Sequence, residues 1–150
     1  MAMFSTAATE ATGASNSAKK LYLKQYIFLD KSITRKINEV AKWRAKLTSV
    51  TSIYTTEPKG GGSIYGKTEE LAAKIVDLEA EINRDIDRSI DLRREIGAVI
   101  ASVPEERERL LLEYRYLDGR TFEWIAAEMD LSWKWVHKLH SKALDKIILG

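Results

Sequence analysis

The chain contains no cysteine, two prolines and two histidines among its 150 residues. Without cysteine it can form neither a disulfide framework nor a cysteine-based zinc site, and an intracellular, reducing compartment is the expected location. No apolar run reaches the length of a membrane span, and the N-terminus lacks the cationic region and apolar core of a secretion signal. These absences predict a cytoplasmic protein that does not interact with the membrane.

A large excess of charge of one sign is also missing. Lysine and arginine outnumber aspartate and glutamate by 24 to 22, so a globally basic surface does not argue for nucleic-acid binding. The charge is uneven, however, because residues 131–150 contain four lysines and one aspartate. The high charged fraction and the scarcity of proline are typical of long solvated helices, and they predict an all-α fold.

Apolar periodicity predicts two long helices, at 19–52 and 68–103, joined by a Gly-rich loop at 53–67. Residues 1–18 are rich in Ala, Ser and Thr and are interpreted as a disordered leader. The recurring apolar residues are Leu29, Ile33, Ile37, Val40, Leu47 and Val50, then Leu71, Ile75, Leu78, Ile82, Leu92, Ile96, Val99 and Val103. Amphipathic helices of this length are not stable alone, so we expect a hairpin, a coiled coil between copies, or both. A homo-oligomer, with a dimer favoured, follows from this pattern.

Two features of these helices have alternative interpretations. The basic residues of the first helix could contact nucleic acid, but a solvated helix face is favoured. Residues Gly61–Thr68 match the letters of a phosphate-binding loop. Such a loop follows a buried β-strand in an alternating α/β chain, and neither is predicted here, so a flexible linker is favoured over nucleotide binding.

The segment Thr121–Ile147 has the spacing of a helix-turn-helix. Its small residue at the helix crossing is Ala126, and Asp130 stands where the turn often has glycine. The apolar positions of the motif are Ile125, Met129, Leu131, Val136 and Leu139. A support helix of about 104–116, started by a capping box of Ser102 and Glu105, completes a three-helix domain at 104–150.

The second helix of the motif is predicted to begin after Ser132 and to present polar side chains to the major groove of DNA. Lysines at every fourth position, from Lys134 to Lys146, would follow a phosphate backbone. The predicted DNA-contacting residues are Arg120, Thr121, Ser132, Trp133, Lys134, His137, Lys138, Ser141 and Lys142. A purely solvating role for the lysines is the alternative, and Trp135 is expected to pack against the domain. A metal site at His137 and His140 is disfavoured because no third ligand is evident.

From Val103 to Lys146 the chain resembles region four of bacterial sigma factors. The resemblance rests on Pro104, Arg109, the run Tyr114–Tyr116 and the ending Lys142–Leu144. Over its whole length the chain resembles phage-encoded sigma-like proteins grouped with the ArpU and RinA late-gene regulators. This implies a long helical hairpin or coiled coil, then a three-helix domain like a winged helix without its wing.

The resemblance implies a sequence-specific regulator that binds double-stranded DNA, activates phage late genes and acts with host RNA polymerase. No enzyme activity, cofactor or metal is expected. The run Trp133–Trp135 replaces the Arg-Glu-rich helix start of region four, so the family's promoter target is not carried over. The alternatives are a small terminase subunit for DNA packaging and a structural helical interaction protein.

Overall fold

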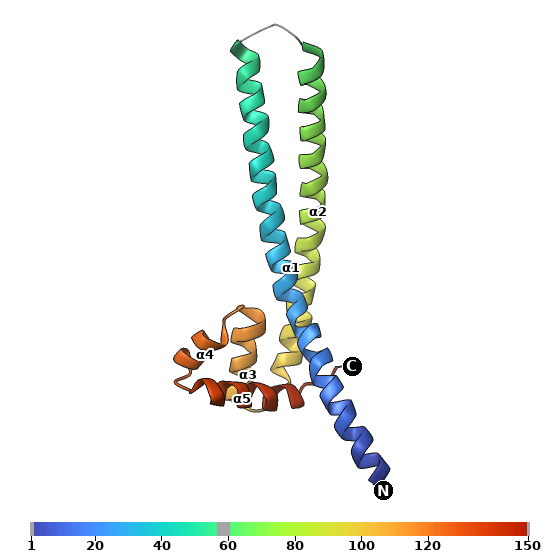
Figure 1. Cartoon of the computed structure of the whole chain (residues 1–150), viewed down its shortest axis with the longest axis vertical. Coiled ribbons are helices and arrows are strands. Elements are labelled where there is room, and N and C mark those ends of the chain that lie inside the picture. Colours follow the sequence, from blue (N-terminus) through green and yellow to red (C-terminus); the bar gives the residue numbers. More distant parts are fainter. Residues whose placement is uncertain (1, 57–60, 150) are drawn as a thin grey trace. The chain divides into compact units, whose positions relative to one another are not determined.

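A computed structural model describes the backbone of residues 2–56 and 61–149, and the side chains of 16–50 and 66–149. Over these residues every regular element is helical, which confirms the all-α prediction (Figure 1). The elements are α1 (Ala2–Thr56), α2 (Gly61–Ala101), α3 (Glu106–Leu112), the π-helix η1 (Glu113–Leu117), α4 (Phe122–Glu128) and α5 (Trp133–Asp145). Within the described segments, no helix is long and apolar enough to cross a membrane.

Both long helices extend further than the sequence pattern predicts. The backbone is helical from Ala2, although residues 1–18 have the composition of a disordered leader. The many alanines of this segment favour a helix, and the adjoining turns are held in place by Asn16 and Lys19. The predicted loop 53–67 also narrows, because α1 continues to Thr56 and α2 starts at Gly61; residues 57–60 lie outside the described part.

The segment Gly61–Thr68 is the first two turns of α2. A phosphate-binding loop needs an open turn between a β-strand and a helix, so that consecutive backbone N–H groups point at the phosphates. The helical backbone here, with no β-strand in the described residues before it, does not have that geometry. The nucleotide-binding alternative therefore has no structural support.

The chain divides into two compact units, which are described separately. The hairpin unit consists of residues 29–89. The terminal unit consists of residues 1–28 and 90–150, so it joins the first part of α1 and the end of α2 to the helix-turn-helix.

In the hairpin unit, α1 and α2 run antiparallel and pack against each other within one chain (Figure 1). The core contains Ile33, Val40, Ile75 and Ile82, all predicted from the apolar periodicity. Leu29, Trp43, Leu47 and Leu78 pack around it. Ile37 is an exception to the predicted stripe, because 49% of it is exposed.

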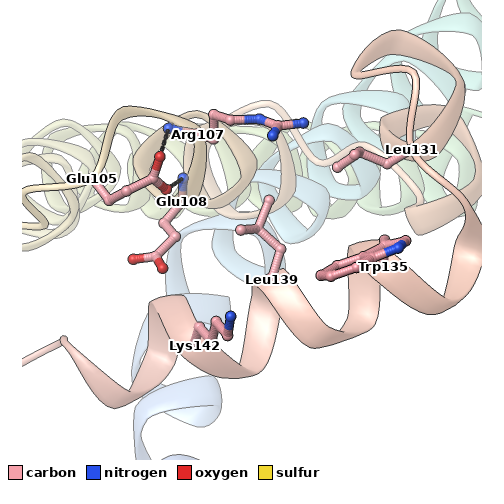
Figure 2. A pocket seen from close by; sticks show the side chains of 7 residues that line it. All are labelled: Glu105, Arg107, Glu108, Leu131, Trp135, Leu139 and Lys142. Atoms are coloured by element: carbon pink, nitrogen blue, oxygen red, sulfur yellow. Dashed lines mark hydrogen bonds between the residues drawn. The ribbon is translucent and has the colours of Figure 1, made fainter.

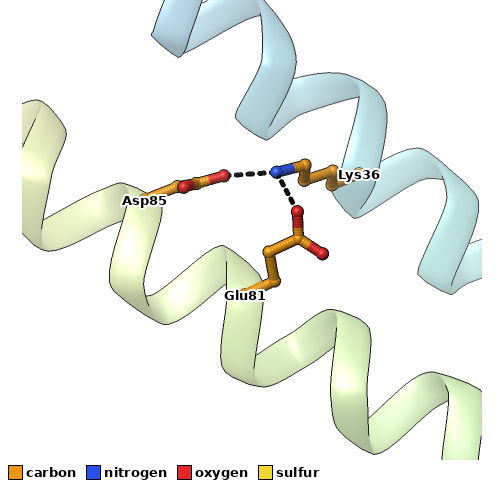
Figure 3. A network of polar contacts seen from close by, with 3 residues as sticks. All are labelled: Lys36, Glu81 and Asp85. Carbon is orange, nitrogen blue, oxygen red and sulfur yellow. Dashed lines mark hydrogen bonds and ion pairs between the residues drawn. The ribbon is translucent and has the colours of Figure 1, made fainter.

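A cation between the two helices fixes their register. Lys36 of α1 lies 2.6 Å from both Glu81 and Asp85 of α2, which are one helical turn apart (Figure 3). Hydrogen bonds to Asp85 and then to Glu81 raise the pKa of Lys36. Asp85 and Ser89 are polar residues within the apolar stripe of α2, and the ion-pair partner of Asp85 is a lysine of the same chain.

In the terminal unit, the first part of α1 is attached to the end of α5. Lys19 Nζ is buried and donates a hydrogen bond to the Leu144 carbonyl (2.9 Å), and Asn16 Nδ2 donates to Asp145 Oδ1 (2.9 Å). The buried apolar residues of the unit are Leu23, Leu92, Ile96, Ile100, Val103, Leu111, Leu112, Tyr116, Ile125, Val136, Ala143, Leu144 and Ile147. The core of the helix-turn-helix is therefore completed by both long helices.

The packing of the hairpin unit leads to a stability prediction with a matched control. Ile82 is 8% exposed, whereas Ile86, one turn later on α2, is 37% exposed. We expect Ile82→Ala to lower the unfolding free energy by about 2–4 kcal/mol, and Ile86→Ala by less than about 1 kcal/mol. Urea unfolding followed by circular dichroism measures both. Equal losses would show that the hairpin core is not the one described.

Candidate DNA-binding site

The support helix α3 is capped by Glu105, the residue directly before it. The Glu105 carboxylate accepts hydrogen bonds from the backbone N–H groups of Arg107 (3.2 Å) and Glu108 (2.8 Å), and these bonds, chiefly the one from Glu108, lower its pKa. The predicted capping box with Ser102 is wrong. The Ser102 hydroxyl instead donates to the Val99 carbonyl (2.6 Å), because Ser102 directly follows the last turn of α2 and its N–H still bonds back to that helix.

The second half of the predicted support helix is the π-helix η1. Its wider turn is seen in the hydrogen bond from the Asp118 N–H to the Glu113 carbonyl (3.1 Å). This turn directs Tyr116 into the core and leaves Arg115 at the surface, where Nη1 donates to the Arg120 carbonyl (3.0 Å). A π-turn inside a helix is often associated with a functional site. Apolar periodicity cannot reveal it, since the pattern assumes a constant α-helical repeat.

The turn of the helix-turn-helix has the backbone that the sequence predicts. Thr121 caps α4 by accepting a hydrogen bond from the Trp124 N–H (3.1 Å). Asp130 has a φ of 55°, so an aspartate takes the left-handed conformation for which glycine is the usual residue. The Leu131 N–H then bonds to the Ala126 carbonyl (2.9 Å), which closes the turn before α5.

Helix α5 has one buried face and one exposed face. Ser132 caps it, as predicted, by accepting a hydrogen bond from the Trp135 N–H (3.2 Å). Val136, Ala143 and Leu144 are fully or almost fully buried, while Leu139 is half-buried. Because one side of α5 is held in the core, the opposite side is fixed towards solvent.

Most predicted contact residues lie on the exposed surface of this domain. Those that are exposed are Arg120, Thr121, Ser132, Trp133, Lys134, Lys138, Ser141 and Lys142. Two of them, Thr121 and Ser132, use their hydroxyl oxygens as helix caps. The Arg120 guanidinium lies 4.4 Å from the centre of the Trp124 ring, which orients it at the start of α4.

His137 is less accessible than expected for a residue predicted to contact DNA. Its ring is half-buried between Phe122 and Trp133, with ring centres 4.6 and 4.1 Å away. The Nε2 atom is buried and has no hydrogen-bond partner among the described residues. Trp133 itself is 60% exposed, so its ring both covers His137 and faces solvent.

The prediction that Trp135 packs against the domain is wrong, because the side chain is 57% exposed. Its neighbour Lys138 places Nζ 5.3 Å from the centre of the indole ring. A cavity of about 310 Å³ is lined on one side by Trp135 and Leu139 of α5, and Figure 2 shows Glu105 and Glu108 across from them, at the start of α3. The side chain of Trp135 therefore faces this cavity and solvent, and not the core of the domain.

The row of lysines on α5 is shorter than predicted. Lys146 lies 2.6 Å from the Glu108 carboxylate, whose side chain is only 5% exposed. A buried carboxylate requires a cation nearby, so Lys146 serves the packing of α3 on α5. Lys134, Lys138 and Lys142 remain exposed at four-residue spacing.

A buried polar pair that the sequence did not predict joins η1 to α5. Tyr116 Oη and His140 Nε2 are 2.7 Å apart and share a hydrogen bond, and both residues are buried. Burial lowers the pKa of His140 to about 4 and raises that of Tyr116 to about 12, so both are neutral at pH 7. His140 therefore serves the core, and the described residues hold no cluster of three or more potential metal ligands.

Comparison with known proteins supports this interpretation of the C-terminal part. The family described as Sigma-70, region 4 matches residues 105–147, which span α3 to the end of α5. No curated protein and no solved structure matches the chain. The fold is therefore two long helices followed by a helix-turn-helix domain like sigma region four. The match also supports DNA binding by that domain.

The neutral state of His140 leads to a prediction about pH. Its folded pKa of about 4 lies below its ordinary value of 6.5. The unfolded chain therefore binds the proton first, so stability is present above about pH 6.5 and is lost as the pH falls towards 4, by about 3 kcal/mol. His140→Gln keeps a partner for Tyr116 but cannot gain charge. Unfolding free energies measured at pH 7, 5.5 and 4 should fall less steeply for this variant, and parallel slopes would contradict the assignment.

Proposed function

We propose that this protein is a non-enzymatic transcription regulator that binds double-stranded DNA with α5 in the major groove. The observation that carries the proposal is the fixed orientation of α5. Its apolar face is locked in a core, and the opposite face presents Lys134, Lys138 and Ser141 to solvent. A helix held in this way fits the width of the major groove, and such motifs contact base edges through the first half of that helix.

The exposed side chains divide into two roles in this proposal. Backbone phosphates are bound by Lys134, Lys138 and Lys142. The lysine ammonium is a point charge on a long flexible side chain, so it can pair with a phosphate from many directions. Trp133 lies at the start of α5 with an exposed indole, which can contact a thymine methyl or a sugar. Arg120 adds a cation at the start of α4, the helix that crosses the backbone in this motif.

In its finer form, the proposal is a phage late-gene activator that acts with host RNA polymerase. It is supported by the combination of a long helical hairpin with a region-four-like domain, which is the organisation of the ArpU and RinA regulators that the sequence resembles. The match to region four also supports contact with polymerase, since that region belongs to a polymerase subunit.

A homo-oligomer, with a dimer favoured, is the second part of the proposal. The hairpin unit leaves Ile37 49% and Val76 62% exposed after its own helices have paired. Apolar side chains on such a narrow unit favour burial against a second copy. Two copies would also place two reading helices on one DNA molecule.

The DNA-binding proposal is tested by a double substitution on α5. Lys134→Ala with Lys138→Ala should lower the affinity for DNA fragments and reduce the magnitude of the slope of log K against log salt by about two units, because two phosphate contacts are lost. Gel shifts and fluorescence anisotropy on fragments of the neighbouring genome measure both quantities. Lys42→Ala with Lys46→Ala is the matched control, since both lysines are exposed at the same spacing on α1.

Two outcomes would contradict this proposal. The absence of any site-specific complex at low salt would favour a structural helical interaction protein instead. An unchanged slope in the α5 double variant of a protein that still binds DNA would show that α5 is not the helix that contacts the phosphates.

The oligomer proposal predicts a molar mass of twice that of the single 17.0 kDa chain. Light scattering on the purified protein, with and without a bound DNA fragment, measures it. Ile37→Glu should shift the mass towards the single chain, because a carboxylate in an apolar interface is costly to desolvate. A ring of many copies would contradict the dimer and favour a small terminase subunit.

A further inference from the structure

A second cavity of the terminal unit lies beside α5 and is lined by cations. Its volume is about 180 Å³. The lining residues are Lys20, Lys24, Arg115, Tyr116, Phe122, His137 and His140. They come from the first part of α1, from η1, from the start of α4 and from α5, and no acidic side chain is among them.

The two lysines of α1 are one helical turn apart and so lie on the same face of the helix. Neither has a hydrogen bond or an ion pair with another described residue, and Lys20 is exposed while Lys24 is half-buried. Their backbone is held in place, because Lys19 is bonded to the Leu144 carbonyl and Leu23 is fully buried. The cavity therefore has two ammonium groups on a fixed helix, neither of them paired within the described part of the chain.

The third cation is oriented by its own contacts. Arg115 is held by the Arg120 carbonyl and by the Phe122 ring, whose centre is 4.2 Å from the guanidinium carbon. After burial, the charges of Lys20 and Arg115 are the largest influences that lower the pKa of His140. Lys20 and Arg115 are thus close enough to His140 to disfavour a further positive charge at the cavity.

The cavity also contains an unsatisfied polar atom. His137 Nε2 is buried without a hydrogen-bond partner among the described residues, and a buried polar atom of this kind calls for a ligand or a water. His137 lies one turn from both Trp133 and Ser141 on α5, so the cavity adjoins the exposed face of that helix. Several cations and an imidazole nitrogen, with no carboxylate among the lining residues, are the chemistry of a phosphate site.

We propose that this cavity binds a backbone phosphate of the DNA duplex whose major groove holds α5, with Lys20 and Lys24 as its ligands. The inference rests on the proposed function and extends the DNA interface to the N-terminal part of α1, which lies outside the residues matched by region four. Duplex DNA is the source that the geometry favours, because a helix in the major groove is flanked by phosphates on both sides.

The test substitutes both lysines together, Lys20→Ala and Lys24→Ala, in the full chain. Alanine preserves helix propensity, and circular dichroism checks that the fold is intact. We expect the slope of log K against log salt for duplex DNA to fall in magnitude by about one unit, since one phosphate contact is lost. Lys42→Ala with Lys46→Ala removes the same charge from exposed positions of the same helix and should keep the wild-type slope.

A titration with inorganic phosphate distinguishes a site for a DNA backbone phosphate from a site for a free phosphate ion. The ring signals of His137 and His140 in NMR spectra should shift when duplex DNA binds the wild type, and inorganic phosphate should shift them only at concentrations of tens of millimolar or more. Saturation by phosphate below the millimolar range, together with an unchanged DNA slope in the Lys20/Lys24 variant, would mean a site for a free anion and overturn the assignment. An equal fall in slope for the Lys42/Lys46 control would also overturn it, as a general effect of charge.

Failure of the inference can be distinguished from failure of the proposed function. If the wild type binds duplex DNA and the Lys20/Lys24 variant keeps its slope, the phosphate site alone is wrong. If the wild type forms no complex at low salt, the DNA-binding function fails and the phosphate site fails with it.

Discussion

The burial of one face of α5 is the constraint on which the terminal unit depends. Val136 and Ala143 are fully buried, and Leu144 is 1% exposed. A helix with such a face cannot rotate without exposing apolar surface, at a cost of about 25 cal/mol for each Å². The same constraint fixes the opposite face towards solvent. The presentation of Lys134 and Lys138 is thus a consequence of packing on the other side of the helix.

That buried face also contains polar groups, and each has a partner that determines where another element lies. His140 is matched by Tyr116, which the π-turn η1 directs inwards. The Leu144 carbonyl, near the end of α5, accepts a hydrogen bond from the buried ammonium of Lys19. Because an unpaired buried polar group is costly, these bonds link α5 to η1 and to α1. The cation-lined cavity beside α5 is a result of that arrangement.

Much of the fold follows from local patterns. Apolar periodicity predicted the hairpin core at Ile33, Val40, Ile75 and Ile82, and the spacing from Thr121 predicted the helix-turn-helix with its cap at Ser132. Two of the errors concern choices between two local partners. Ser102 could cap the next helix or bond back to its own, and Trp135 could turn to the core or to the cavity. Neighbouring residues in the sequence do not decide such choices.

By itself, the sequence determined the helical class, the helix-turn-helix and the row of lysines on α5, because each is a repeat within one helix or a short turn. Only the tertiary structure decided that α1 and α2 pair within one chain, through Lys36 between Glu81 and Asp85. It alone also placed Lys20 and Lys24 beside His137, more than a hundred positions away. Contacts between distant segments depend on how buried surfaces fit together, and periodicity along one helix carries no information about that fit.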